Sequence, residues 1–121
     1  MKTILFVAAG GALGSVMRYL ISKIFTTSFP LGTLVVNVIG CFLIGFFYGI
    51  FANRGCSLSA DTRAMLTVGL CGGFTTFSTF INDCSKLVSL DQYLHAGLYL
   101  ALSILLGFVA LYLGQKTSLY L

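Results

Sequence analysis

The segment of this sequence best suited to chemistry lies at residues 69–80, where three glycines and four hydroxyl side chains interrupt an apolar run. It comprises Gly69-Leu70-Cys71-Gly72-Gly73-Phe74-Thr75-Thr76-Phe77-Ser78-Thr79-Phe80. Glycine weakens a helix through its backbone entropy, and β-branched threonine has restricted side-chain freedom there. We therefore expect a helix break between Gly72 and Thr76. Carbonyl groups freed by such a break must face protein, water or an ion, and carbonyls in mid-membrane can coordinate Na⁺.

Two phenylalanines, Phe77 and Phe80, follow this expected break. Their spacing of three residues puts them on one helix face. Such a pair can simply pack in a core. It can also contact an anion, because the edge of an aromatic ring carries partial positive charge.

Two other apolar runs contain isolated polar side chains. Asn37 shares a helix face with Thr33, and its amide can either bond two helices together or donate to a polar ligand. In the last run, Tyr99, Ser103 and Gly107 recur every four residues and form one face with two hydroxyls. That face can serve packing, with the serine bonded to its own backbone, or it can donate hydrogen bonds.

Arg18 is the one basic residue that lies deep in an apolar run. A guanidinium there must extend to the interface, pair or face water, and in the last case it would attract anions to a vestibule. The only acidic candidate within these runs is Asp83, which we expect at the end of the third. A proton- or cation-coupled carrier normally needs a deeper carboxylate.

The composition requires an apolar solvent around the chain. Of 121 residues, 58% are hydrophobic and 8% are charged, against about 25% charged in soluble domains. The net charge of +4 comes from scattered lysines and arginines, which gives nucleic-acid binding little support. The four cysteines form no CxxC motif and there is one histidine, so neither a zinc site nor a disulfide framework is expected. Cys41 and Cys71 lie inside apolar runs, where cysteine behaves as a small hydrophobic residue.

Four windows are long enough to cross a bilayer as helices, which need about 20 apolar residues each. We expect them at residues 3–25, 31–52, 64–82 and 93–114. Barrel strands would alternate apolar and polar residues, and these runs do not. The first run resembles a secretory signal, yet three more apolar runs follow it, so we interpret it as a permanent span. The sequence therefore predicts an all-α membrane protein of one domain, residues 1–121, with the third of its four transmembrane helices broken.

The basic residues give only a weak orientation signal. With four spans, Lys2, Arg54, Arg63 and Lys116 share one side of the membrane, and the other side has two or three basic residues. A weak positive-inside bias lets a chain insert both ways. We therefore expect dual topology and an antiparallel homodimer.

Taken together, three segments closely resemble the Fluc (CrcB) family of bacterial fluoride channels. They are residues 10–19 around Arg18, residues 32–42 with the Gly-Thr…Asn…Gly pattern around Asn37, and residues 72–80, Gly-Gly-Phe-Thr-Thr-Phe-Ser-Thr-Phe. The resemblance covers essentially all four spans. It implies passive export of cytoplasmic fluoride across the bacterial plasma (inner) membrane, protection against fluoride toxicity, and an antiparallel dimer with two pores and a structural Na⁺ on its two-fold axis.

The resemblance also implies roles for individual residues. The expected fluoride pore is lined by Asn37, Phe77, Phe80, Thr79, Tyr99 and Ser103, with Arg18 at the vestibule and the backbone carbonyls of Gly72 and Thr75 as Na⁺ ligands. Two positions depart from the family: Asp83 stands where many members have Glu, and Gly107 stands where some have a second hydroxyl.

Three other function classes compete with this interpretation. A small proton-coupled multidrug exporter is also a four-span, dual-topology dimer, but it needs an early intramembrane carboxylate. Three GxxxG pairs, Gly10/Gly14, Gly45/Gly49 and Gly69/Gly73, can pack helices within or between subunits. A helper subunit of a larger complex would use these faces without needing Asn37 or the helix break. An enzyme is not expected, because the sequence offers no nucleophile–base pair or metal set.

Overall fold

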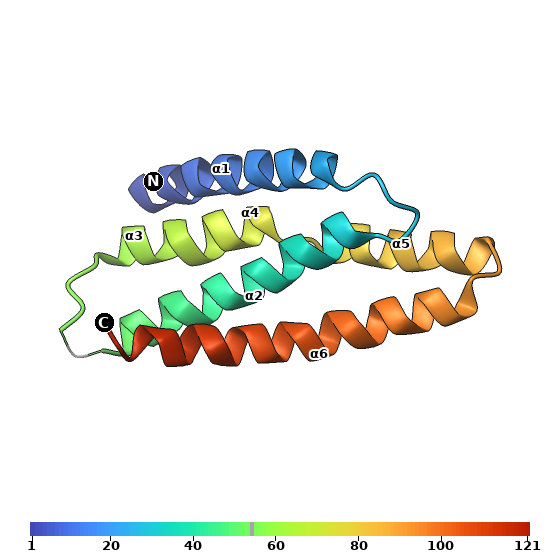
Figure 1. Cartoon of the computed structure of the whole chain (residues 1–121). Coiled ribbons are helices and arrows are strands. Elements are labelled where there is room, and N and C mark those ends of the chain that lie inside the picture. Colours follow the sequence, from blue (N-terminus) through green and yellow to red (C-terminus); the bar gives the residue numbers. More distant parts are fainter. Residues whose placement is uncertain (54) are drawn as a thin grey trace.

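Four helical segments run alternately in opposite directions, so both termini lie at the same end of the bundle (Figure 1). The computed structural model describes residues 1–53 and 55–121, and Arg54, one of the basic residues counted above, lies outside the described residues. The helices are α1 Lys2–Ile24, α2 Leu31–Ala52, α3 Ala60–Ala64, the π-helical η1 Met65–Cys71, α4 Gly72–Phe74, α5 Phe77–Ser89 and α6 Tyr93–Ser118.

All four segments are long and apolar enough to cross a membrane, with α3 to α5 forming the third. The chain is therefore a multi-pass membrane protein, as predicted. The bounds of α2 match the expected window, but the third span runs from Ala60 to Ser89 and is longer at both ends than residues 64–82. The third span begins earlier because Ser59 accepts the Thr62 N–H and caps α3. It ends later because Leu87, which lies among polar residues such as Lys86 and Ser89 in the sequence, is buried on the last turns of α5.

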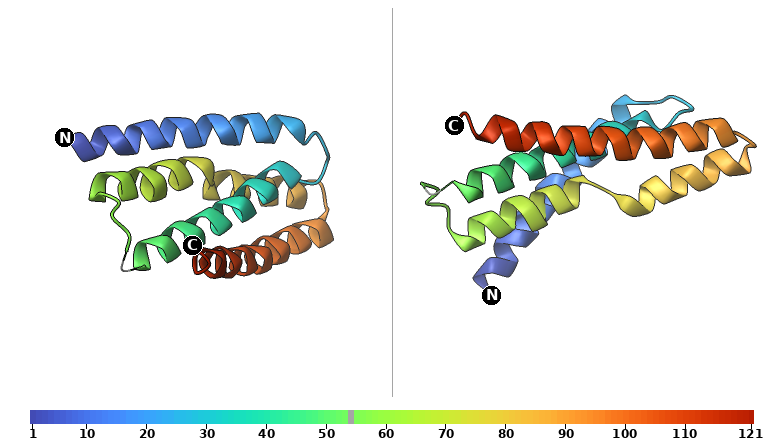
Figure 2. Two further views of the ribbon diagram at one scale, coloured as in Figure 1. Left: turned by 60° about the vertical axis from the view of Figure 1, so that its left-hand side comes forward. Right: turned by 90° about the horizontal axis from the view of Figure 1, so that it is seen from below.

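The third span breaks at Thr75 and Thr76, within the predicted interval. Both residues have extended backbone, with ψ of 161° and 123°. The hydroxyl of Thr76 then accepts the Thr79 N–H at 3.3 Å and starts α5 as an N-cap. The break thus ends one helix and begins another in mid-span (Figure 2).

Close backbone contact joins α1 to η1 and α4. A Cβ added to Gly69 would lie 2.7 Å from the Val7 carbonyl oxygen, and one added to Gly73 would lie 2.6 Å from that of Gly11. Only glycine permits this approach. These glycines therefore pack helices within one chain, which the sequence had left open.

The other long contact joins α2 to α6, and α5 packs against the first part of α6. The α5–α6 turn is closed by two backbone hydrogen bonds, from Gln92 N–H to Leu87 O and from Asp91 N–H to Val88 O. Asp91 takes the left-handed conformation, with φ of 56°, as the residue after a helix often does. This turn brings Tyr99 of α6 against Phe80 and Leu87 of α5 in the main buried cluster.

Candidate functional site

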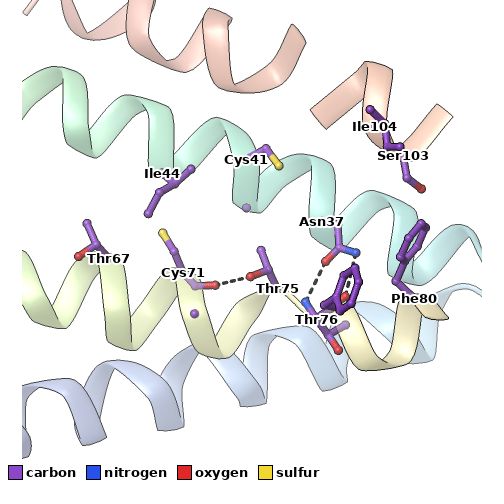
Figure 3. A pocket seen from close by; sticks show the side chains of 13 residues that line it. Asn37, Cys41, Ile44, Thr67, Cys71, Thr75, Thr76, Phe80, Ser103 and Ile104 are labelled. Carbon is purple, nitrogen blue, oxygen red and sulfur yellow. Dashed lines mark hydrogen bonds between the residues drawn. The ribbon is translucent and has the colours of Figure 1, made fainter. Parts of the chain in front are cut away.

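An open cavity of about 480 Å³ lies between α2, α6 and the two halves of the broken span (Figure 3). We call it the central groove. It brings together four of the six residues expected to line a pore, namely Asn37, Phe77, Phe80 and Ser103. Gly72 and Thr75, the expected cation ligands, also line it. Residues from all of the last three spans therefore meet where the third span is interrupted.

Asn37 holds the break in place. Its Nδ2 donates to the Thr76 carbonyl oxygen at 3.1 Å, and its Oδ1 accepts the Thr76 N–H at 2.9 Å. The amide therefore satisfies both backbone groups that the broken helix leaves unpaired at Thr76. An amide nitrogen carries two hydrogens, so a second N–H of Asn37 remains beyond this pair.

The two phenylalanines have different environments. The ring of Phe80 is 8% exposed and lies 5.0 Å from the Tyr99 ring, centroid to centroid. The Phe77 ring lies 6.2 Å from Phe80 but is 76% exposed. Phe80 is thus fixed by the core behind it, whereas Phe77 stands at the open side of the groove.

Ser103 brings an unsatisfied hydroxyl to the groove. Its Oγ is buried, and among the described residues no group forms a hydrogen bond with it. An unpaired buried hydroxyl costs about 1–3 kcal/mol. This atom is therefore available to a water molecule or an ion in the groove.

Tyr99 lies behind the groove rather than in its lining. It is fully buried, and its hydroxyl donates to Asp83 Oδ2 at 3.4 Å. Thr33 Oγ1 donates to the same oxygen at 2.8 Å. Asp83 was expected at the end of the third span, but that expectation is wrong, because the span continues to Ser89 and places this carboxylate in the middle of α5.

A second cavity, of about 280 Å³, contains Arg18. We call it the arginine cavity. Its hydroxyl-bearing residues are Ser15, Tyr19, Ser22, Thr33, Thr76 and Thr79, and Val36 completes its lining. Thr79, expected in the pore, therefore lies with Arg18. The arginine cavity and the central groove share Thr76.

The break supplies oxygen atoms that a cation could use. In an unbroken helix the Gly72 carbonyl would accept the Thr76 N–H, but that N–H donates to Asn37 instead. Within residues 1–53 and 55–121, no three His, Cys, Asp or Glu side chains group together to hold a metal ion. Carbonyl oxygens at a break within a membrane helix are among the groups that can coordinate Na⁺.

The groove also contains residues that the sequence did not place in the pore, and two of them, Thr76 and Cys41, bear on its chemistry. Thr76 was treated only as part of the break, although its backbone is the partner of Asn37. Cys41 was treated as a small hydrophobe, but it lines the groove. Its spacing of four residues from Asn37 was the available signal, since residues four apart share a helix face.

Comparison with known proteins confirms the family resemblance predicted from the sequence. Residues 5–115 match the family described as "CrcB-like protein, Camphor Resistance (CrcB)". The chain is 46% identical over 118 residues to a protein of Flavobacterium psychrophilum, covering 94% of both chains. It is 45% identical to a protein of Phocaeicola vulgatus, covering 94% of this chain and 96% of the relative, and 44% identical to one of Shewanella woodyi, covering 96% and 95%.

Each of these three relatives is named "Fluoride-specific ion channel FluC". The family is thus one of ion channels, a class without enzymatic activity, as the sequence predicted. With the match spanning nearly the whole chain, this protein belongs to the CrcB family of membrane channels.

Proposed function

We propose that this protein is a fluoride-selective channel that lets cytoplasmic fluoride leave passively across the bacterial plasma (inner) membrane and so protects against fluoride toxicity. The observation that carries this proposal is the lining of the central groove. Within the part of the chain that the structure describes, its side chains are all uncharged, and they include the Asn37 amide, the unpaired Ser103 hydroxyl and the rings of Phe77 and Phe80.

The chemistry of this lining suits fluoride. Fluoride is small and strongly hydrated, so a pore must offer hydrogen-bond donors in exchange for water. The second N–H of Asn37, the Ser103 hydroxyl and the ring edges of Phe77 and Phe80 can do this. A fixed positive charge in the narrow region would hold the ion too tightly to conduct.

In the proposed pathway the fixed positive charge of Arg18 lies in the arginine cavity, at the approach to the groove. The half-buried Arg18 and the hydroxyls around it would concentrate anions before they reach the groove. The membrane potential then favours exit from a negative interior by about 2.3 kcal/mol per charge per 100 mV. No nucleotide or pump is needed for passive export down this gradient.

We further propose that two copies, each one four-helix channel domain of residues 1–121, form an antiparallel, dual-topology homodimer with two pores. The open side of the central groove and the 76% exposed ring of Phe77 support a second copy as the missing wall. A variant with several lysines added to one terminus should lose function when it is expressed alone. Co-expression with an oppositely biased variant should restore function. Full activity from one strongly biased variant alone would contradict dual topology.

A structural Na⁺ at the dimer centre, held by the carbonyls of Gly72 and Thr75, completes the proposal. The released Gly72 carbonyl and the extended backbone at Thr75 support it. Replacing all Na⁺ with N-methylglucamine during purification and assay should stop conduction or dissociate the dimer. Lithium or potassium added back tests whether the site is selective. Unchanged flux and assembly without Na⁺ would rule out a required sodium site.

The decisive experiment is efflux from liposomes that contain the purified protein, measured with a fluoride electrode. We expect rapid fluoride release, with chloride retained in matched liposomes. Absence of fluoride-selective release would overturn the proposed function. Because Asp83 lies within a span, the same assay should be repeated with and without a proton gradient. A requirement for the gradient would favour the coupled-exporter class instead.

A further inference from the structure

We propose that the thiol of Cys41 is a hydrogen-bond donor of the central groove, occupying the space that Gly107 leaves open on α6, and that it helps to set the affinity of the pathway for its anion. This inference rests on the proposed channel function. It adds a specificity-determining residue at a position where the sequence alone suggested only packing.

Four positions lie on the facing sides of two neighbouring helices, α2 and α6. Asn37 and Cys41 lie one helical turn apart on α2 (Figure 3), and Ser103 and Gly107 lie one turn apart on α6. Asn37, Cys41 and Ser103 all line the central groove. One turn further along the same face of α6 the residue is Gly107, which has no side chain.

The sulfur of Cys41 covers this glycine. A Cβ built on Gly107 would lie 3.4 Å from Cys41 Sγ. Apart from the two chain neighbours of Gly107 and the nearby backbone of α6, no other atom of the described residues lies within 4 Å of that Cβ. Gly107 is itself buried. On this face of α6 the hydroxyls of Tyr99 and Ser103 are therefore followed by Gly107, which has no polar side chain. The polar atom at the level of Gly107 is the sulfur of Cys41 on α2.

The chemistry of a thiol fits a conducting pathway. An S–H group donates more weakly than a hydroxyl, and conduction requires each site to hold an ion without trapping it. The amide of Asn37, the hydroxyl of Ser103 and the thiol of Cys41 would then form a series of neutral donors along the groove.

Four variants of the otherwise unchanged chain separate donation from packing. Cys41→Ala removes the donor and the bulk, and Cys41→Val restores apolar bulk alone. We expect both to lower fluoride efflux by about fivefold, the effect of one lost hydrogen bond. Cys41→Ser, which keeps a donor, should stay within about twofold of the parent. Cys41→Ala with Gly107→Ser should recover most of the loss, because it delivers a hydroxyl to the same space from α6.

Silver ion gives an independent measure of access. In a variant that carries Cys56→Ser, Cys71→Ala and Cys84→Ser, Ag⁺ binding at Cys41 forms one S–Ag bond and releases the thiol proton. We expect silver nitrate to block efflux and to protect Cys41 from alkylation after denaturation. The matched cysteine-free protein, which adds Cys41→Ser, should be insensitive. If the chain that keeps only Cys41 does not assemble, the four variants of the parent chain still decide the question.

The outcomes separate this inference from the proposed function. Normal efflux from Cys41→Val, or failure of Gly107→Ser to rescue Cys41→Ala, would reduce Cys41 to a packing residue while the channel function stands. Silver that neither blocks nor protects the assembled Cys41-only protein would also overturn the inference. A parent protein that releases no fluoride would overturn both.

Discussion

The central groove and the arginine cavity meet at Thr76 but have opposite chemistry. The groove is bordered by Asn37, Ser103 and aromatic rings, none of them charged. The arginine cavity contains a guanidinium surrounded by hydroxyls. The helix break is the boundary between them, and the Asn37 side chain holds that boundary through two hydrogen bonds to Thr76.

This difference suggests a division of labour within a short membrane protein. A charge attracts an anion over a distance but also binds it strongly, whereas neutral donors replace hydration without a deep energy minimum. Putting the charge in one cavity and the donors in the other would permit both capture and release. Substitutions at three positions test this separation, beginning with the residue that holds the boundary.

Asn37→Ala should have the largest effect. It leaves the N–H and C=O of Thr76 unpaired in an apolar environment, at a cost of about 1–3 kcal/mol each, and it removes a groove donor. We expect fluoride efflux to fall about 100-fold, the equivalent of about 2.7 kcal/mol. Efflux from liposomes measures the flux, and size-exclusion chromatography of the purified protein reports assembly.

The matched control for this variant is Asn82→Ala. Asn82 is an exposed asparagine on α5, in the same span as Thr76. We expect the control to keep the parental flux. If Asn37→Ala conducts as well as Asn82→Ala, the Asn37 amide is required neither to hold the helix break nor to bind the ion. Conduction would then not depend on the separation of the two cavities.

Phe80→Ile should have an intermediate effect. It removes the ring edge from the groove and the contact with the Tyr99 ring, and aromatic pairs contribute about 0.5–1.5 kcal/mol. We expect efflux to fall about tenfold, which corresponds to about 1.4 kcal/mol. The loss should be equal at low and high ionic strength, because no net charge is removed.

Phe108→Ile provides a control for lost aromatic bulk within the membrane, since Phe108 is 74% exposed on α6. Its flux should remain at the parental level. An equal reduction in both variants would indicate a general effect on folding or insertion. Unchanged flux in Phe80→Ile would remove the ring from the proposed pathway.

Much of the fold was predictable because the membrane requires long apolar helices. The bounds of α2 and the extended segment at Thr75 and Thr76 follow from local sequence, whereas the partner helix of each glycine-rich face does not. The depth of Asp83 did not follow, because hydropathy falls near Asn82 while the helix continues through the buried Leu87.

Sequence reasoning identified several residues of the candidate site, but it did not predict how they are divided between the central groove and its surroundings. Asn37, Phe77, Phe80 and Ser103, to which the family resemblance assigned pore roles, all line one groove. Tyr99 and Thr79 belong to other surroundings, the first beside Asp83 and the second beside Arg18. Helical spacing gives the face of each helix, but it does not say which neighbouring helix covers that face, and that depends on how the two halves of the broken span diverge.

Arg18→Gln should have the smallest effect of the three, and it alone should depend on salt. The arginine cavity would lose its positive charge while the groove stays intact, so efflux should fall about threefold at about 10 mM ionic strength, where electrostatic attraction extends roughly 30 Å. At about 1 M, with screening over about 3 Å, the variant and the parent should converge. Arg18→Lys keeps the charge and should resemble the parent at both concentrations. A loss in Arg18→Gln that persists unchanged at high salt would mean that the guanidinium contacts the ion directly. The charged and neutral cavities would then act on the anion at the same step, and the separation between them would no longer explain how the ion is both attracted and released.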